Sequence, residues 1–508
     1  MQDDPYPRPV LDLLVAAGNR TVFEHGARAV TGERMLGLVR RIAAGLRAAA
    51  IGPGDGVAMM LGVNPEAFAA MIAGHVVGAR VVGVRPGLPD GQLRHVLDQD
   101  VTAVVTDAAT GPEHAPRTLT IAELSATPDD GGPLHLSGRP HDVARLLHTS
   151  GSTGTPKACA QTYAALNAAW TARPEAWPPA IRELASRLQR YLVFGSLSSQ
   201  VMMEYGVLTL AAGGTMVVAD PPVFPEAITR HRASASVITV PRLHKLVTAQ
   251  RRDPADLSSL RALMVSGSPL EASRLREALD VLGPVVFHGY GQTETGTISM
   301  ATPSDVPPSV GFPPEVIDVE VRDADGRPVP AGVDGELYVR TPAQASGYWA
   351  EPAETADVFV DGWVRTRDLG HFDEDGRLYL AGRARDVIIV NADLHYAGPI
   401  ERVLASSSDI AEAYVVGTPD EDTGEAVHAF VVPAAKTPDL ASLRTLVREQ
   451  LGDACVPVTI TVLDEAPLAP SGKPDKRLLA AAISQAENGP PSGPPGRRPG
   501  DTATPSTQ

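Results

Sequence analysis

The sequence contains little cysteine and no long uninterrupted hydrophobic run. Its two cysteines, Cys159 and Cys455, lie far apart among 508 residues and cannot build a disulfide framework. Such cysteine usage suits a reducing compartment. The longest apolar runs, such as residues 76–84, are interrupted and too short to span a bilayer. The first nine residues lack the charged-then-apolar pattern of a secretion signal. These absences predict a cytoplasmic protein without a membrane span.

The sequence also lacks an excess of positive charge. It has 44 lysines and arginines against 60 aspartates and glutamates, which gives a formal net charge of −16. No electrostatic footprint for nucleic acid is present, and an anionic membrane surface is disfavoured. A hydrophobic content of 43% and a charged content of 20% are ordinary for a globular protein. The length indicates more than one domain, and no internal repeat is visible.

Apolar segments of two periodicities alternate through the first 280 residues. Strands are predicted over residues 57–61, 81–84, 101–105, 143–147, 191–194, 215–218, 237–240 and 263–265. Helices are predicted over residues 31–50, 66–78, 92–97, 162–170, 199–212 and 270–280. Residues 107–140 are rich in Pro, Gly, Asp and Thr and are expected to form a poorly ordered connection. The alternation predicts a largely parallel sheet covered by helices on both faces.

The spacing of apolar residues changes after residue 316. Short alternating segments with turns, at 318–321, 335–339 and 376–380, predict an antiparallel or barrel-like piece. A compact α+β unit follows, with strands at 387–390, 411–416, 429–432 and 458–463 and helices near 398–407 and 438–452. The Pro- and Gly-rich tail after residue 483 cannot bury enough apolar surface to fold.

The most informative stretch is a loop of hydroxyl groups, glycines and a lysine, Thr149-Ser-Gly-Ser-Thr-Gly-Thr-Pro-Lys-Ala158. It lies between a predicted strand and a predicted helix, where glycines let backbone amides approach a phosphate and Lys157 supplies a charge. The alternative is a flexible linker. A P-loop is excluded, because Gly154 is followed by Thr-Pro-Lys rather than by Lys and Ser or Thr. The loop is therefore a phosphate-binding candidate of another kind.

A second motif, His288-Gly-Tyr-Gly-Gln-Thr-Glu-Thr-Gly296, follows a predicted strand at 285–287. The Tyr290 ring is flanked by glycines and is suited to stacking on a base. Thr293 and Glu294 place a hydroxyl beside a carboxylate, which suits a magnesium-bound phosphate, because Mg²⁺ takes few carboxylates together with substrate oxygens. The alternative is a turn at the end of a strand with an exposed glutamate.

Three further motifs follow towards the C-terminus. They are Trp363-Val-Arg-Thr-Arg-Asp-Leu-Gly370, Gly382-Arg-Ala-Arg-Asp386 and Pro467-Leu-Ala-Pro-Ser-Gly-Lys473. Taken singly, Asp368 is compatible with an ordinary salt bridge, and Lys473 with a solvated side chain on a glycine turn.

Together, these five elements closely resemble, in order, the motifs of the adenylate-forming (AMP-binding) superfamily. That superfamily comprises acyl- and aryl-CoA synthetases, stand-alone adenylation domains and luciferases. The resemblance implies an α/β fold: a large N-terminal domain (1–382) of mixed and parallel sheets flanked by helices with a small barrel-like part, a hinge (383–386), a small mobile α+β lid domain (387–483) and a disordered tail (484–508).

The resemblance also assigns roles to individual residues. The groups expected to bind ATP or AMP are Thr149, Ser150, Gly151, Ser152, Thr153, Gly154, Lys157, Gly289, Tyr290, Gly291, Asp368 and Arg383. The catalytic groups are Thr293 at the α-phosphate, Glu294, which helps to hold Mg²⁺, and Lys473, which bridges the attacking carboxylate and the α-phosphate. Arg385 would be the pivot of the hinge, and Ala392 would line a tunnel for the pantetheine thiol. Arg367 and Ala392 depart from the family pattern, which has glycine at both positions.

The implied reaction is ATP- and Mg²⁺-dependent activation of a small carboxylic acid as an acyl-adenylate, followed by thioester formation with CoA. The acid pocket is expected at Ser198, Gln200, Gly267, Ser268 and His288. Gln200 stands where amino-acid-activating domains carry aspartate, so a simple α-amino acid is disfavoured, because a buried ammonium needs a carboxylate partner. Glu204 is a candidate partner for a displaced amine, as in a β-amino acid. The alternatives are loading of an acyl, aryl or β-amino acid onto the phosphopantetheine of a separate carrier protein, and a degenerate nucleotide-binding protein without catalysis.

Overall fold

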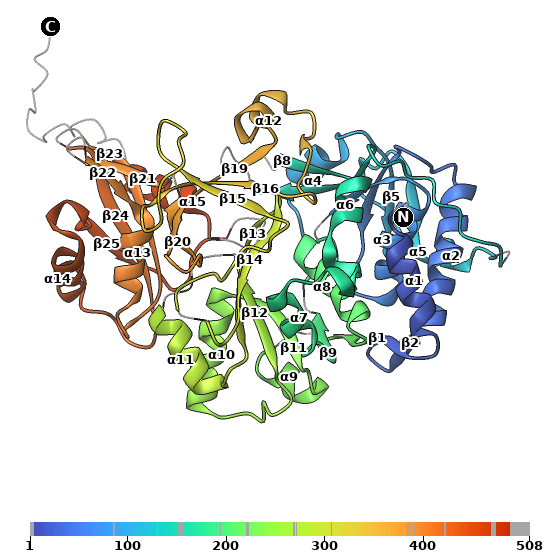
Figure 1. Ribbon diagram of the computed structural model, residues 1–508, viewed down its shortest axis with the longest axis horizontal. Coiled ribbons are helices and arrows are strands. Elements are labelled where there is room, and N and C mark those ends of the chain that lie inside the picture. Colours follow the sequence, from blue (N-terminus) through green and yellow to red (C-terminus); the bar gives the residue numbers. More distant parts are fainter. Residues whose placement is uncertain are drawn as a thin grey trace, which may run out of the picture.

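The computed structural model describes residues 5–84, 87–129, 131–149, 157–193, 195–219, 223–267, 270, 272–305, 307–383, 386–390, 393–420, 423–468 and 474–487. Within these ranges three sheets lie in the part of the chain before residue 384, and a fourth lies after it. Figure 1 shows the elements from β21 onwards as a lobe at the left, with the N-terminal helices at the right. In these described ranges, no helix combines the length and the apolar character that crossing a membrane requires.

The first sheet has seven strands in the order β17-β8-β7-β4-β3-β5-β6. The strands from β7 to β6 in this order pair in parallel, whereas β8 and β17 add two antiparallel strands at one edge. Their bounds are β3 (Gly56–Met60), β4 (Arg80–Gly83), β5 (Val101–Thr106), β6 (Thr118–Thr120), β7 (Val143–Thr149), β8 (Lys157–Thr162) and β17 (Gly347–Tyr348).

The second sheet has eight strands in the order β14-β13-β12-β11-β9-β10-β1-β2. It is parallel except for its two edge strands, β2 and β14. The bounds are β1 (Thr21–His25), β2 (Arg28–Thr31), β9 (Arg190–Val193), β10 (Thr215–Val218), β11 (Ala235–Thr239), β12 (Ala262–Ser266), β13 (Val286–Gln292) and β14 (Gly296–Ala301).

Eleven α-helices accompany these two sheets within the described residues. They are α1 (Arg8–Ala17), α2 (Gly32–Ala48), α3 (Pro65–Val76), α4 (Asp90–Leu97), α5 (Ile121–Ala126), α6 (Tyr163–Ala168), α7 (Pro179–Ala185), α8 (Gln200–Ala211), α9 (Glu226–His231), α10 (Val240–Arg252) and α11 (Ala272–Leu282). Helix α2 shows why such segments fold as predicted: the Thr31 hydroxyl caps it by accepting from the Arg34 N–H, and Val39, Ile42 and Leu46 bury one face.

Helices α3 and α8 lie between the two sheets, and their apolar composition explains this position. Every residue of α3 except Glu66 is buried, and Met203, Tyr205 and Leu208 of α8 are buried as well. A helix that is apolar on all sides is stable only when it is enclosed. Helix α3 contacts β3 and β4 of the first sheet and β1 of the second. One hydrophobic core therefore joins both sheets.

The third sheet is antiparallel, as the short alternating segments after residue 316 predict. Its order is β15-β16-β19-β18, and β20 also pairs with β19. Helix α12 packs against β17, β18 and β19. The bounds are β15 (Asp318–Arg322), β16 (Gly335–Arg340), α12 (Pro352–Val358), β18 (Phe359–Val360), β19 (Trp363–Phe372) and β20 (Leu378–Arg383).

The C-terminal α+β unit has its own sheet, β22-β21-β24-β23 with β25 beside β24, and its own core. Its elements are β21 (Val387–Val390), β22 (Asp393–Tyr396), α13 (Ala397–Ala405), β23 (Ile410–Asp420), β24 (Gly424–Pro433), α14 (Leu440–Leu451), β25 (Thr459–Val462) and α15 (Lys476–Glu487). Helix α15 continues four residues past the predicted domain end, and the rest of the expected tail lies outside the described residues.

Two expectations about the central part of the chain are wrong. The loop after β7 is followed by the antiparallel strand β8, which precedes the helix predicted over residues 162–170. Buried residues Ala158–Gln161 pair with β7, because a short apolar run is a strand when a neighbouring edge is available. Residues 107–140 are not structureless. They contain β6 and α5, and Thr120 and Glu123 form a capping box at the start of α5.

Candidate functional site

The motif at 288–296 is a β-hairpin rather than a turn after a strand. Strand β13 runs through to Gln292, Thr293 and Glu294 lie in the turn, and β14 returns antiparallel. Gly291 is required by the close approach of the two strands, because a Cβ there would lie 2.3 Å from the Gly296 carbonyl oxygen. Gly289 would bring a Cβ to 3.1 Å from the Met264 sulfur. The glycines therefore serve strand packing, which a sequence pattern cannot distinguish from a turn.

Asp368 is the centre of a buried polar cluster. The Tyr290 hydroxyl donates to Asp368 Oδ2 at 2.8 Å, and Gln292 Nε2 donates to the same oxygen at 2.6 Å. Arg383 Nε donates to Oδ1 at 3.1 Å, from the neighbouring strand β20. The structure thus brings Tyr290, Asp368 and Arg383 together as predicted neighbours, and it adds Gln292, which the sequence did not single out. A carboxylate with both oxygens accessible to donors suits a pair of adjacent hydroxyl groups.

Burial governs the behaviour of Tyr290. The residue is 7% exposed and its ring packs in the core of the third sheet with Ile298 and Leu337. Burial raises the pKa of the Tyr290 hydroxyl well above its usual value, and the negative charge of Asp368 adds to this effect. The hydroxyl therefore stays protonated and acts as a hydrogen-bond donor.

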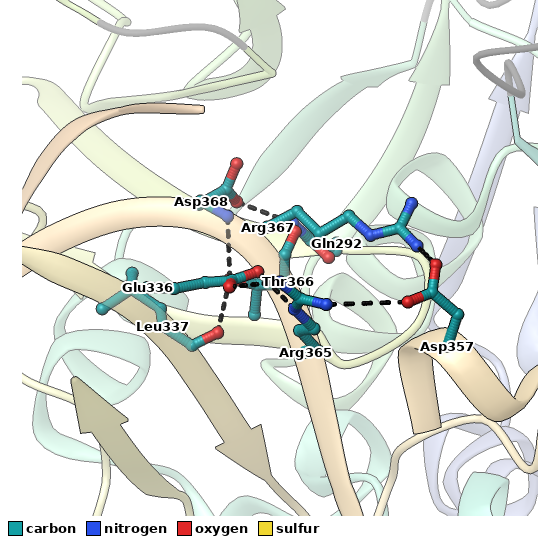
Figure 2. A network of polar contacts seen from close by, with 8 residues as sticks. All are labelled: Gln292, Glu336, Leu337, Asp357, Arg365, Thr366, Arg367 and Asp368. Atoms are coloured by element: carbon teal, nitrogen blue, oxygen red, sulfur yellow. Dashed lines mark hydrogen bonds and ion pairs between the residues drawn. The ribbon is translucent and has the colours of Figure 1, made fainter. Parts of the chain in front are cut away.

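Arg367, which replaces a family glycine, has the left-handed backbone conformation that glycine favours, with φ = 60°. Its guanidinium pairs with Asp357 of α12. Figure 2 shows the Arg367 side chain extending towards Asp357, away from the Asp368 carboxylate. The neighbouring Arg365 is bidentate with Glu336, at 2.8 Å for each bond, and lies 3.6 Å from Asp357. The arginine thus preserves the backbone turn and places its charge beside α12.

Glu294 and Lys157 both lie beside Tyr348 of β17. The Tyr348 hydroxyl donates to Glu294 Oε1 at 2.6 Å, and the Ala345 N–H donates to the Glu294 carbonyl oxygen at 2.8 Å. Lys157 Nζ is 2.5 Å from Glu354 Oε2 of α12 and 5.8 Å from the centre of the Tyr348 ring. Tyr348 therefore links the predicted magnesium ligand to the predicted phosphate-binding lysine, and it is a residue that sequence reasoning missed.

The phosphate-loop candidates fall largely outside the described part of the chain. Ser150, Gly151, Ser152, Thr153 and Gly154 lie outside it, and Thr149 is described by its backbone alone, which pairs with Lys157 across the β7–β8 ladder.

A small cleft beside α8 is lined by two of the five residues expected at the acid pocket, Ser198 and Gln200. Gly83, Arg145, Ser198, Gln200 and Met203 are among its lining residues. The Ser198 hydroxyl donates to the Val84 carbonyl at 3.1 Å, and Gln200 Nε2 donates to Glu204 Oε1 at 2.9 Å. That same oxygen of Glu204 lies 2.8 Å from Arg145 Nη2. A substrate amine at Glu204 would therefore have to compete with a guanidinium, which weakens the hypothesis of a β-amino acid.

Of the remaining pocket candidates, His288 lies within β13 and Gly267 directly follows β12. Burial lowers the pKa of His288 to about 4, against a hydrogen bond with the Ser309 backbone, so the ring is neutral. Its Nδ1 atom is buried without a hydrogen-bond partner among the described residues. Gly267 has φ = 95° directly after β12, a conformation that favours glycine. Ser268 lies outside the described residues.

At the hinge and in the C-terminal domain, Arg385, Ala392 and Lys473 lie outside the described residues. Residues near them in the described part of the chain form a small cluster of ion pairs. Lys476 Nζ is 2.5 Å from Asp386 Oδ2 and 2.7 Å from Glu401 Oε1. Lys476, three residues after Lys473, is thus connected to the hinge aspartate.

Matches to family models agree with this geometry. Residues 15–349 match the AMP-binding enzyme family, and residues 399–473 match the AMP-binding enzyme C-terminal domain. The chain belongs to the AMP-binding enzyme family, whose members activate acids by adenylation, and the resemblance inferred from the motifs is confirmed.

Individual relatives cover nearly the whole chain. A feruloyl-CoA synthase from an Amycolatopsis species is 32% identical over 473 residues, which are 89% of this chain and 94% of that protein. A fatty acid–[acyl-carrier-protein] ligase, ScoC, from Streptomyces coeruleorubidus is 31% identical, over 89% of this chain and 91% of that protein. The structure of the amide bond synthetase McbA from Marinactinospora thermotolerans superposes with a TM-score of 0.82 at 33% identity, over 93% of this chain and 99% of that chain.

Proposed function

We propose that this enzyme joins a small carboxylic acid to the thiol of CoA in two steps. In the first, the carboxylate attacks the α-phosphate of ATP, the bond to the leaving pyrophosphate breaks, and an acyl-adenylate forms. In the second, the thiol attacks the acyl carbon, the carbon–oxygen bond to the phosphate breaks, and AMP leaves. The observation that carries this proposal is the cluster of Tyr290, Gln292 and Arg383 around Asp368. Tyr290 and Gln292 are close in the chain to Glu294.

The described side chains fit the adenosine end of ATP. Asp368 would accept hydrogen bonds from the two ribose hydroxyls. Arg383 would hold the carboxylate through its hydrogen bond to Oδ1. Tyr290 would present the exposed part of its ring to the adenine. Gln292 would fix the Asp368 carboxylate through its bonds to Oδ2 and to the Thr366 carbonyl. Positioning of this kind makes the attack effectively intramolecular.

Glu294 fits the ligand set of Mg²⁺, which takes one or two carboxylates and completes its shell with water and phosphate oxygens. Tyr348 holds one Glu294 oxygen, which orients the carboxylate. Bound there, Mg²⁺ would offset negative charge on the phosphates. Thr293, beside Glu294 in the same turn, would donate to the α-phosphate.

Other residues would act on the phosphates of ATP and on the attacking thiol. The loop 149–157 would bind the β- and γ-phosphates. Lys473 would bridge the attacking carboxylate and the α-phosphate, and a rotation about Arg385 would withdraw it after adenylation. The segment with Ala392 would then line the path of the thiol.

Lys473→Ala provides the sharpest test of these roles. We expect the variant to lose acid-dependent pyrophosphate release, because negative charge at the α-phosphate is no longer offset, and to keep thiolysis of a supplied acyl-adenylate. Lys436→Ala, at an exposed lysine of the same domain, is the matched lysine control and should keep adenylation. Normal adenylation by the Lys473 variant would refute the assignment.

A panel of acids in ATP–pyrophosphate exchange tests the function as a whole. Exchange with an acid, followed by its CoA thioester in the mass spectrum, is the expected result. Binding of ATP without exchange for any acid would instead favour a degenerate nucleotide-binding protein.

Two other acceptors are alternatives that the relatives support. The likeness to an acyl-carrier-protein ligase favours a carrier phosphopantetheine, and the likeness to an amide bond synthetase favours an amine. Supplying CoA, a carrier protein and simple amines in parallel to the activated acid separates them, because each product has its own mass.

A further inference from the structure

Two cations beside the predicted nucleotide site are held by carboxylates of one helix. Lys157 pairs with Glu354, and Arg367 pairs with Asp357, one helical turn further along α12. Thr355 anchors this helix to the β17 strand, since its hydroxyl accepts from the Tyr348 N–H at 2.9 Å. Tyr348 in turn holds Glu294. One short segment, residues 347–358, thus contacts the motifs at 149–157, 288–296 and 363–370.

The two cations pair with neighbouring positions on one helix, because residues 354 and 357 are three apart on α12. The hydrogen bond from Lys157 lowers the pKa of Glu354, and the charges of Lys157 and Arg367 lower it further. Arg367 therefore lies near the predicted phosphate-binding lysine, beside the segment that also contacts the predicted magnesium ligand.

Burial is unequal within each pair. The side chains of Lys157 and Arg367 are 11% and 15% exposed, whereas those of Glu354 and Asp357 are 32% and 53% exposed. The cations are fixed by their surroundings, while the carboxylates can move into water at little cost. Because the carboxylates already reach water, opening these pairs costs less than opening a pair that is buried on both sides. A phosphate brings more charge and more acceptor atoms than a carboxylate and exchanges for it readily.

We propose that Arg367 binds the pyrophosphate part of ATP together with Lys157, and that Asp357 and Glu354 occupy the two cations until the nucleotide displaces them. The proposal rests on the proposed function for the identity of the nucleotide. Arg365 is not part of this proposed phosphate site, because Glu336 holds its guanidinium through two hydrogen bonds. Arg367 would thus give this chain a second phosphate-binding cation at a position where its family has a glycine.

Calorimetric titration of the full-length protein with MgATP, pyrophosphate and AMP tests this inference without knowledge of the acid. In Arg367→Gly we expect affinity for pyrophosphate and MgATP to fall about 10- to 100-fold, the effect of losing hydrogen bonds between charged groups. Affinity for AMP should stay unchanged. Glycine accepts the backbone at φ = 60°, and Arg367→Asn provides a second neutral variant that tolerates this conformation.

The opposite effect is expected when the competing carboxylate is removed. Asp357→Asn should bind pyrophosphate roughly two- to fivefold more tightly, because the ligand no longer displaces an ion pair. Arg340→Gln, which breaks an exposed pair with Asp318, is the matched control and should change neither affinity. A residue with a merely structural role would weaken binding in both the Arg367 and the Asp357 variants.

The outcomes separate this inference from the proposed function. Unchanged pyrophosphate affinity in both Arg367 variants, or an equal loss of AMP affinity, overturns the inference. If the expected binding pattern appears and no acid supports pyrophosphate exchange, the inference stands and the proposed function fails. If exchange is normal and the Arg367 variants bind pyrophosphate like the parent, the inference alone fails.

Discussion

At the scale of single residues, Asp368 shows how hydrogen-bond partners fix the direction of a buried side chain. Asp368 accepts from Tyr290 and Gln292 on one oxygen and from Arg383 on the other. Each donor comes from a strand next to Asp368 or facing it, so the carboxylate has one orientation. A group oriented before its ligand arrives costs little to reorganise on binding.

We expect Asp368→Asn to weaken AMP binding about 10-fold or more, because an amide offers one acceptor oxygen and turns donors towards Arg383 and Tyr290. Calorimetry with AMP measures this loss. Asp318→Asn, at an exposed pair with Arg340, serves as the control. Equal AMP affinity in both variants would remove Asp368 from the nucleotide site.

At the scale of elements, segments with a strong period or cap were predictable and segments defined by distant partners were not. The Thr31 cap and the spacing of Val39, Ile42 and Leu46 predict α2 closely. Strand β8 is not predicted from the sequence, because its pairing with β7 and β17 is not encoded locally. The alternative of a turn at the end of a strand at 285–287 is wrong, because β13 runs on to Gln292, and Gly289 and Gly291 permit its close packing on neighbouring strands.

The candidate site shows the same division. The sequence pattern predicted that Tyr290, Asp368 and Arg383 would meet, and they do. It did not predict Gln292 or Tyr348, since an amide and a phenol become part of a site only through the strands that bring them there. Arg367 could not be placed either, because the sign of its φ angle depends on the local bulge of β19 against β16.

The cap of α2 gives a prediction at this scale. We expect Thr31→Ala to lower the free energy of unfolding by about 1 kcal/mol, because the Arg34 N–H loses its acceptor. Thr31→Ser keeps the hydroxyl and should retain most of the stability. Urea denaturation followed by circular dichroism measures both, and equal losses in the two variants would contradict the role of the cap.

At the scale of the whole molecule, Arg274 joins the two parts of the chain. It lies on α11, and its Nη2 donates to the carbonyl of Ala405 at 3.2 Å and to that of Ile410, both in the C-terminal domain. Its Nη1 lies 2.7 Å from His244 Nδ1 on α10. This single guanidinium therefore ties two helices of the large part to the end of α13.

We expect Arg274→Gln to speed amide hydrogen exchange at the end of α13 several-fold, since two carbonyls lose a charged donor. Exchange in α3, far from this contact, should stay the same. Arg276→Gln, an exposed arginine on the same helix, is the control. Equal exchange at α13 in the two variants would show that Arg274 does not hold the domains together.

Buried histidines make the stability of the molecule depend on pH. Burial, aided by the charge of Arg145, lowers the pKa of His75 to about 3, and burial lowers that of His288 to about 4. In the unfolded chain both titrate near 6.5. Their contribution is fully present above that pH and is lost as pH falls towards 4, by about 2 kcal/mol per histidine at pH 5.

Melting temperatures between pH 7 and pH 5 should therefore fall steeply for the parent protein. We expect a shallower fall in His75→Leu, which no longer binds a proton on unfolding. The ring of His75 packs against Tyr6 and Tyr163, so leucine keeps an apolar side chain there. His141→Gln at an exposed site should leave the slope unchanged, and an equal slope in the His75 variant would contradict the prediction.

The pairing of β1 has a consequence for synthesis on the ribosome. This strand forms near the N-terminus, yet its parallel partner β10 emerges roughly 190 residues later, a delay of about 10 to 40 s at ordinary translation rates. Until then Val22 and Phe23, which are buried in the finished protein, have an open strand edge beside them. The nascent chain thus carries an exposed apolar edge for most of the time it takes to make the first half of the protein, and this interval is when a holding chaperone would bind it.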